Sequence, residues 1–547
     1  MSFLIFCYNK YETSVNLSYP CYNHPMNIRK LPIGIQSFEW LRNNEYLYVD
    51  KTEFIYRLAN EGKTYFLSRP RRFGKSLLLS TMRAYFEGKK ELFTGLKISE
   101  LEKDWIKYPV FYFDFNGSKY ESSNDLATVF DIHLSKWEEI YGSNPNITKE
   151  NLPGRFNALL ETAHKKTGLC VVVLVDEYDK SLLESEGAAL EESRKLFKGF
   201  FGNLKGCDEH LRFTFITGVT KFSKVSIFSD LNQLCDISLD KTYSTICGIS
   251  QNEMEESFKP EIQELAKETS LSYEECLSQL QQMYDGYHFH PNGEGLYNPF
   301  SLINALFKKE FGNYWFETGT PTFLLKKLKE DNFDARKFST DKISEFQDDL
   351  QDYRSDNPDP IPLFYQSGYL TIKSFDNKYK KYRLGYPNNE VRYSFLRCLV
   401  PLFTYQRNNA SSLSVDEFCE DVQHGEINSF MTRFKSLFAN LPYSTKPDDT
   451  VIEQNFQNII YIVFILMGQF VTVEQHYSQG RSDCIVQADN YIYLFEFKRD
   501  KTADLALQQI EENNYAAAFA SDKRKLFKIG VNFDSKEKNI ADWKVVE

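Results

Sequence analysis

The sequence predicts an α/β fold whose N-terminal part is a P-loop parallel sheet with helices on both faces. A strand-forming run at residues 64–67 leads through a basic loop into Gly-Lys-Ser at residues 74–76, and a helix-like run over residues 77–86 follows. A continuous β-branched run over residues 169–175 predicts a buried central strand. Across residues 28–245, strand-like and helix-like segments alternate, which is typical of a parallel sheet covered by helices.

The other strands of this region follow from their apolar runs. Residues 46–51 predict a strand that ends in charge, and residues 110–115 predict a second, strongly apolar strand. Residues 212–216 predict a further strand that runs into a polar Thr-Gly turn.

The loop before the first helix has the residues of a phosphate-binding site. Backbone N–H groups at the helix N-terminus would face an anion, and the helix dipole adds to the attraction. Lys75 is placed to reach the outer phosphates of ATP, and Ser76 is placed to ligate Mg²⁺. The remaining loop residues expected to contact the nucleotide are Arg71, Arg72, Phe73, Gly74 and Leu77.

Arg69 stands where the GxxxxGK[ST] pattern has its first glycine. Arginine cannot adopt glycine-only backbone conformations cheaply, and Pro70 has no N–H to offer a phosphate. We therefore expect the loop to turn differently, with Arg71 or Arg72 supplying positive charge. Because a basic turn before Gly-Lys-Ser also arises by chance, a second motif is needed.

That second motif is Asp176-Glu177, directly after the predicted central strand. Asp176 can hold Mg²⁺ through water, and Glu177 can orient and polarise the attacking water. A solvated acidic turn gives the same pattern, but a Gly-Lys-Ser loop roughly a hundred residues upstream favours the nucleotide site. Thr217 or Thr220, after the next strand, is a candidate sensor of the γ-phosphate, and an ordinary strand-to-loop turn explains these threonines equally well.

A third group of candidate residues lies near the C-terminus. Residues 480–486 and 491–498 predict a hairpin that turns across residues 488–490. Glu496 and Lys498 share one face of its second strand, and Asp483 lies on the partner strand. Two carboxylates can bind Mg²⁺ and an ammonium can stabilise charge on a phosphate, which indicates a catalytic metal site. A cross-strand salt bridge accounts for the same spacing, and the pattern alone does not choose between them.

Composition limits the classes of function. A chain of 547 residues is long enough for about three to four domains. Its net charge of −11 argues against non-specific coating of nucleic acid, so any DNA contact needs a local patch. Ten cysteines without a CxxC pair predict reduced thiols in an intracellular, cytoplasmic protein. No segment reaches the roughly 18 apolar residues of a membrane span, so we expect no membrane partner.

We expect four parts along the chain. Residues 1–27 lack periodicity and predict a disordered tail, residues 28–245 a P-loop domain, residues 246–430 a mainly helical region, and residues 431–547 a C-terminal α/β domain. Residues 431–547 contain 14 Lys and Arg against 16 Asp and Glu, a net charge of −2, which is not a basic DNA footprint. Residues 523–525, Lys-Arg-Lys, could still form a local patch.

Several long motifs occur in a fixed order after Lys30. They are residues 31–35, 48–52, 69–77, 217–223, 284–287, 297–300 and 314–320, followed by Asp483…Glu496-x-Lys498. With these motifs the chain resembles the predicted AAA-ATPase-like proteins that carry a C-terminal PD-(D/E)xK nuclease-superfamily domain. In that family, an arginine in place of the first glycine of the GxxxxGK[ST] pattern, as at Arg69, is normal.

The resemblance implies a fold and a set of site residues. It implies a winged-helix-like lid in the middle region and a PD-(D/E)xK nuclease-like domain at the C-terminus. It implies ATP and Mg²⁺ as cofactors, with the nucleotide handled by Lys75, Ser76, Asp176 and Glu177. In the nuclease-like domain it implies a core of Asp483, Glu496 and Lys498, in which Glu453 from the preceding helix joins the two acids as a metal ligand. Gln509 and Tyr515, on the following helix, match positions that the superfamily often keeps polar.

Two functions remain open at this point. The first is an ATP-regulated, Mg²⁺-dependent nuclease with DNA as its partner. The second is a STAND-like nucleotide-dependent switch whose C-terminal domain binds a partner or nucleic acid without cleaving it. A homo-oligomer is left open.

Overall fold

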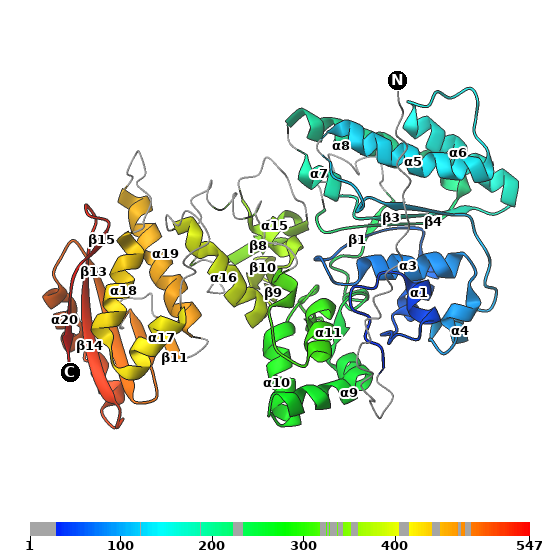
Figure 1. Cartoon of the computed structure of the whole chain (residues 1–547). Helices are drawn as coiled ribbons and strands as arrows, with labels where there is room; N and C mark the ends of the chain where they lie inside the picture. The colour runs from blue at the N-terminus through cyan, green and yellow to red at the C-terminus, as the bar shows by residue number, and fades with distance from the viewer. Residues whose placement is uncertain are drawn as a thin grey trace, which may run out of the picture.

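Three regions follow one another along the chain (Figure 1). The computed structural model describes residues 29–547, except residues 121, 186, 222–232, 318–323, 325–327, 329–335, 337, 339–342, 352–358, 404–414, 440–448, 469–471 and 476–482. The expected tail at residues 1–27 therefore lies outside the described residues.

The N-terminal region is built on a parallel sheet, as the sequence predicts. In the described chain, five strands lie in the order β2-β3-β4-β1-β5, and each pairing is parallel. Their bounds are β1 Thr64–Ser68, β2 Val110–Asp114, β3 Val171–Asp176, β4 Leu211–Gly218 and β5 Cys235–Asp236. β3 is buried along its whole length, which explains its unbroken apolar sequence. Because the strands are parallel, the loops after β1, β3 and β4 open at one edge of the sheet.

Helices cover both faces of this sheet (Figure 1). One face carries α5 (Ser123–Tyr141), α6 (Leu152–Thr167) and α8 (Gly187–Gly206), and the other carries α1 (Phe38–Asn43), α2 (Thr52–Glu61), α3 (Lys75–Phe86) and α4 (Ile98–Leu101). The short helix α7 (Lys180–Glu184) follows β3. On the first face, Phe156 and Phe200 stack with their ring centroids 4.0 Å apart, and Phe113 packs edge-on against both rings.

The strand expected at residues 46–51 does not form. Tyr46 makes only an isolated bridge to Lys30, and the chain then runs without regular structure into α2. The apolar side chains of this segment pack against helices instead of a sheet neighbour, as the edge-on contact of Tyr48 with Phe38 shows. Lys51 is buried, and its Nζ forms an ion pair with Glu253 of the middle region at 2.6 Å.

The middle region is mainly helical and includes a small antiparallel sheet. Its helices are α9 (Gln251–Glu268), α10 (Tyr273–Tyr284), α11 (Pro299–Lys308), α12 (Tyr314–Glu317), α14 (Gln347–Gln351), α15 (Ile361–Ser367) and α16 (Asn389–Phe403). A short ribbon pairs β6 (Ile249–Ser250) with β7 (Leu296–Tyr297), and a three-stranded sheet has the order β8-β10-β9 (Ile343–Phe346, Lys381–Gly385 and Thr371–Asp376). Capping boxes at Ser250 and Ser272 start α9 and α10.

The C-terminal region has a mixed sheet in the order β11-β12-β13-β14-β15, in which β13 and β14 pair in parallel. The strands are Thr472–Gln475, Cys484–Gln487, Tyr491–Arg499, Lys525–Asp534 and Asn539–Val546. The predicted hairpin is confirmed, because β12 and β13 pair antiparallel across residues 488–490. The helices are α17 (Val415–His424), α18 (Ile427–Ala439), α19 (Asp449–Met467) and α20 (Ala503–Glu512). Phe430 and Phe464, on α18 and α19, pack against Phe495 of β13.

Candidate functional site

The loop between β1 and α3 places a helix N-terminus at the open edge of the sheet. Gly74 has φ 93° and immediately precedes α3, and a Cβ atom there would meet nothing within 4 Å. Its glycine is therefore required by backbone conformation, not by crowding. Arg72 also has a positive φ, of 67°, so the loop turns through two left-handed residues. The first N–H groups of α3 thus face outward, where they can bind an anion.

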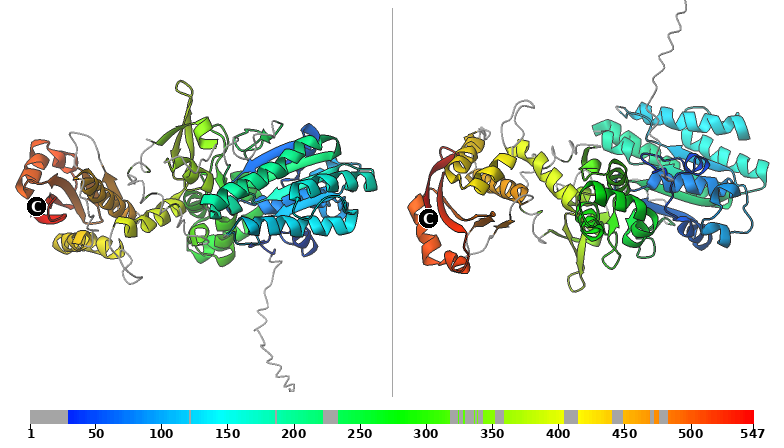
Figure 2. Two further views of the ribbon diagram at one scale, coloured as in Figure 1. Left: turned by 90° about the horizontal axis from the view of Figure 1, so that it is seen from above. Right: turned by 60° about the horizontal axis from the view of Figure 1, so that its bottom comes forward.

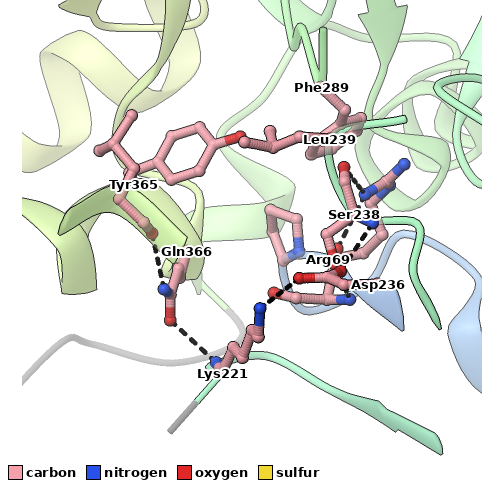
Figure 3. Close-up of a pocket in the computed structure, with 11 residues that line it drawn as sticks. Arg69, Lys221, Asp236, Ser238, Leu239, Phe289, Tyr365 and Gln366 are labelled. Atoms are coloured by element: carbon pink, nitrogen blue, oxygen red, sulfur yellow. Dashed lines mark hydrogen bonds and ion pairs between the residues drawn. The ribbon is translucent and has the colours of Figure 1, made fainter. Parts of the chain in front are cut away.

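Arg69 does not point toward a phosphate. Arg69 is 1% exposed, and its guanidinium donates to the carbonyl oxygens of Ser68 and Ser238 (Figure 3). It also donates to the carbonyl oxygen of Tyr243. The ring of Phe289 lies 3.9 Å from the guanidinium carbon, a cation–π distance. Arg69 therefore fixes the loop from behind, while the exposed Arg71 and Arg72 line the cavity in front, as expected from the sequence.

Lys75 is held close to the loop itself. Its Nζ donates to the carbonyl oxygens of Arg69 and Pro70, at 3.0 and 3.2 Å. The same Nζ lies 3.2 Å from Oε1 of Glu177, which has φ 52° at the end of β3. The two sequence motifs thus meet through an ion pair between their charged residues.

Asp176 lies behind this pair and touches the start of α3. Burial, followed by repulsion from Glu177, raises the pKa of the Asp176 carboxyl, and a hydrogen bond from Ser76 opposes that rise. Thr217 Oγ1 donates to the other side of this carboxylate at 2.9 Å. Ser76 and Asp176 are thus adjacent oxygen donors, a combination that Mg²⁺ prefers. Thr217 is fully buried, so it supports Asp176 and does not line the cavity.

Asp179 is a residue of this site that the sequence reasoning missed. It is fully buried and accepts hydrogen bonds from the backbone N–H groups of Val219 and Thr220 and from the Thr220 hydroxyl. A Cβ atom on Gly218 would lie 2.3 Å from the Asp179 carboxylate, so this close approach requires glycine. Burial and then repulsion from Glu177 raise the pKa of Asp179 to about 6. The sequence places this third acid two residues after Glu177, but it does not indicate which groups the acid binds.

Two adjoining cavities open beside the loop. The larger, of about 400 Å³, is lined by charged and polar groups that include Lys75, Ser76 and Glu177. The smaller, of about 90 Å³, is apolar. Its lining includes Pro32, Phe73, Leu77, Ile249 and Ile303. Phe73 is buried and also packs against Tyr287 and Phe289, so its ring belongs to the apolar side of the site. Pro32, Gly74, Leu77, Pro299 and Ile303 line both cavities.

The C-terminal candidate residues also come together. The backbone N–H of Phe497 donates to the Asp483 carboxylate at 2.9 Å, which holds this acid beside β13. Lys498 Nζ lies 2.9 Å from Oε1 of Glu496 and also donates to the side chain of Gln509 on α20. Glu496 is 1% exposed, and its Oε2 atom has no hydrogen-bond partner in the described structure.

Burial disfavours the charged form of both acids. It raises the pKa values of Asp483 and Glu496, and in Glu496 the neighbouring Asp483 raises the pKa further while Lys498 lowers it. Glu453 falls on α19, but its side chain lies outside the described residues. Among the side chains that the structure describes, no group of three or more His, Cys, Asp or Glu is placed to hold a metal ion.

The comparisons with known proteins agree with this geometry. Residues 32–228 match the family model described as predicted AAA-ATPase, and residues 451–543 match the PD-(D/E)XK nuclease superfamily. A curated relative from Azotobacter chroococcum mcd 1, described as an uncharacterized protein in the vnfD 5′ region, is 34% identical over 533 residues. That match covers 95% of this chain and 99% of the relative. The chain belongs to the predicted AAA-ATPase family with a C-terminal PD-(D/E)XK nuclease-superfamily domain.

In this AAA-ATPase-like protein, the middle region touches the P-loop directly. The indole N–H of Trp315 donates to the carbonyl oxygen of Arg71 at 3.0 Å. Gly368, after α15, has φ 92° and approaches Pro70 so closely that a Cβ atom would lie 2.7 Å from the proline ring. The two loop residues that follow Arg69 are thus packed against the middle region.

A second contact reaches the strand-end loop of the AAA-ATPase-like region. The Lys221 backbone N–H donates to the side chain of Gln366 at 3.0 Å, and Gln366 donates onward to the carbonyl oxygen of Leu350 (Figure 3). The Lys221 ammonium pairs with Asp236 of β5. In the part of the chain that the structure describes, no helix has the length and apolar character needed to span a membrane.

Proposed function

We propose that this protein binds ATP with Mg²⁺ at the P-loop and hydrolyses it. One observation carries the proposal. Lys75, Ser76 and Glu177 line a single cavity at the open edge of the sheet, and Asp176 is hydrogen-bonded to Ser76 directly behind it. Such a cavity, with backbone N–H groups on one side and an acid pair on the other, has the parts that phosphoryl transfer needs.

Each residue has a distinct task in this proposal. Lys75, together with the exposed Arg71 and Arg72, would bind the phosphates. Ser76 and Asp176 would hold Mg²⁺, which neutralises charge between the phosphates when it is bound. Glu177 would accept a hydrogen bond from the attacking water and orient it. The adjoining apolar cavity of about 90 Å³ would take the purine ring, because it opens beside the same glycine, Gly74.

Calorimetric titration with ATP and Mg²⁺ tests this proposal. Lys75→Ala should weaken ATP binding roughly 100-fold, or about 3 kcal/mol, because a buried ammonium–phosphate contact is lost. Lys180→Ala is a matched control, since Lys180 lines the same cavity but donates to the Asn116 carbonyl. Equal ATP affinity in wild type and Lys75→Ala would contradict the proposed site.

For the C-terminal domain we propose Mg²⁺-dependent cleavage of phosphodiester bonds. The supporting observation is the buried, unpartnered Oε2 atom of Glu496 beside Asp483. An orphaned carboxylate oxygen is costly unless a cation binds it, so these acids fit a metal. Asp483 and Glu496, with Glu453 from α19, would hold the ion, which supplies a nucleophilic water when bound. Lys498 would stabilise charge on the phosphate.

Incubation with single- and double-stranded DNA and RNA, with Mg²⁺ or Mn²⁺ and with or without ATP, tests the second activity. Cleavage of DNA that requires the metal and depends on ATP would support it. A specific observation favours the alternative, a nucleotide-dependent switch without cleavage. Glu496 is 1% exposed and paired with Lys498, so the acid cluster is shielded from solvent and from a substrate. Intact substrates under every condition would favour that switch.

A further inference from the structure

The hairpin of β9 and β10 is a basic projection in an acidic protein. Residues 373–383 contain five Lys or Arg and one Asp, whereas the whole chain has a net charge of −11. Figure 2 shows this hairpin standing out from the middle region, away from the main body. Asp376, its single acid, accepts hydrogen bonds from the backbone N–H groups of Lys378 and Tyr379 and so shapes the turn.

Four of the five cations of the hairpin are not neutralised by a carboxylate in the part of the chain that the structure describes. Lys378, Lys380 and Arg383 are exposed, and in the described part of the chain none of Lys378, Lys380, Lys381 and Arg383 forms an ion pair with a carboxylate. The patch expected at residues 523–525 differs in this respect, because two of its three cations are neutralised. Arg524 pairs with Asp522 at 2.7 Å, and Lys525 pairs with Glu547 at 2.5 Å.

The strand register shows which side chains of the hairpin lie on each face of the sheet. Tyr382 pairs with Phe375, and their rings lie 4.7 Å apart on the inner face. Lys381 and Arg383 alternate with Tyr382, so they lie on the outer face. Two aromatic rings are exposed among these cations: Tyr379 is 60% exposed at the turn and Phe346, under Lys381, is 47% exposed. Basic side chains interleaved with exposed aromatic rings are typical of a nucleic-acid contact.

We propose that the β9–β10 hairpin binds double-stranded DNA through its phosphate backbone. The C-terminal nuclease-superfamily match lies in a region with a net charge of −2, so that region does not carry enough positive charge to hold DNA by itself. The hairpin supplies the missing charge from a different region of the same chain. DNA is favoured over RNA because the major groove of B-form DNA admits a two-stranded ribbon, whereas the deep, narrow groove of an RNA duplex does not.

The contacts give binding without sequence preference. Lysine and arginine on a ribbon reach phosphate oxygens, which carry no sequence information. This inference goes beyond ATP hydrolysis and phosphodiester cleavage, because it requires neither a nucleotide nor a metal ion. It can therefore be tested in the presence of EDTA and without ATP, where a failure of either proposed activity has no effect.

Fluorescence anisotropy with a labelled DNA duplex over a series of salt concentrations tests the hairpin in the full-length protein. The variant Lys378→Gln/Lys380→Gln/Arg383→Gln should bind roughly 100-fold more weakly at about 0.1 M salt. The negative slope of log K against log salt should become less steep by about three. Glutamine keeps the side-chain length, and Lys380 already has a positive φ of 55°, so the turn is not strained further. Lys378→Gln alone should lower the slope by about one.

A matched control removes the same charge elsewhere. Lys195→Gln/Lys198→Gln/Lys205→Gln changes three exposed lysines of α8 and should leave both affinity and slope near the wild-type values. Equal loss in the two triple variants would overturn the proposal, because it would show a non-specific effect of net charge. RNA and anionic lipid vesicles serve as competitors. Wild-type protein that binds one of these but not duplex DNA would overturn the proposal as well.

Discussion

The Nζ atom of Lys75 lies 3.2 Å from Oε1 of Glu177, so the cation expected to bind phosphate and the acid expected to act on water neutralise each other. Lys75 is 3% exposed, and its other partners are two carbonyl oxygens of its own loop. A bound γ-phosphate would take the place of Glu177 beside Lys75 and leave the carboxylate free to bind water. In the proposed ATPase, nucleotide binding and activation of water would therefore be coupled through one ion pair.

The first prediction concerns Glu177→Gln. ATP affinity should be equal to or higher than that of wild type, because the competing carboxylate is gone, while the rate of phosphate release should fall at least ~100-fold. Calorimetry and a phosphate-release assay measure the two effects separately. Glu184→Gln, which alters another carboxyl lining the cavity, should change the rate little. Wild-type turnover in Glu177→Gln would contradict the assigned role.

The second prediction concerns pH. The pKa of Asp179 is about 6 in the folded protein and about 3.9 in an unfolded chain, so folding favours the protonated form. The resulting stability is present below about pH 3.9 and is lost as pH rises through about 6, by up to ~3 kcal/mol. Asp179→Asn resembles the protonated carboxyl at every pH. In calorimetric unfolding, the free energy of unfolding of the variant should therefore rise relative to that of wild type between about pH 4 and 8. A difference in stability that does not change with pH would argue against a raised pKa.

The third prediction concerns the contact of the middle region with the P-loop. Trp315→Phe keeps a ring but removes the N–H that donates to the Arg71 carbonyl, a loss of about 1 kcal/mol. If this contact holds the loop ready for nucleotide, ATP affinity should fall roughly fivefold. Trp40→Phe, at a half-exposed tryptophan of α1, should leave the affinity unchanged. Equal ATP affinity in Trp315→Phe and wild type would show that the loop does not need this contact.

The fourth prediction separates a metal site from a structural salt bridge. Glu496→Gln removes a buried carboxylate whose pKa is raised by burial and by Asp483, yet its amide oxygen can still accept a hydrogen bond from Lys498. As a metal site, the variant should keep the wild-type unfolding temperature and lose Mg²⁺- or Mn²⁺-dependent cleavage of DNA. As a salt bridge, it should lose about 3 kcal/mol of stability because the Lys498 ammonium is left without its counter-charge. Glu511→Gln, on the exposed pair with Lys528, should do neither.

Much of the α/β fold could be predicted because its signals are local. β3 is an apolar run that is buried at every residue, and α3 begins at the lysine of a Gly-Lys-Ser triplet. The β12–β13 hairpin likewise follows from two apolar runs and a short polar turn. The expected strand at residues 46–51 failed because its apolar side chains pack against helices, some of them distant in the sequence. Tyr48 contacts Phe38 of α1, whereas Leu47 and Val49 pack on the cluster that contains Met254 and Phe258 of α9.

The roles of Arg69 and Asp179 could not be predicted for a related reason. The partners of Arg69, Ser238 and Tyr243, lie about 170 residues away in sequence, at separations of 169 and 174. Asp179 bonds to a loop 40 and 41 residues downstream. Periodicity and motif spacing describe neighbours along the chain, so they cannot identify which buried polar group a distant loop will satisfy.

The buried guanidinium of Arg69 constrains how this family can change over evolutionary time. An Arg69→Gly exchange would restore the common loop sequence, yet it would remove the guanidinium that donates to the carbonyl oxygen of Ser238 and to that of Tyr243, which the Ile246 N–H also reaches. The reverse exchange, in a relative that has glycine at this position, would bury a guanidinium without carbonyl oxygens placed to accept its hydrogen bonds. We therefore expect position 69 and residues 238–243 to be inherited as a linked set.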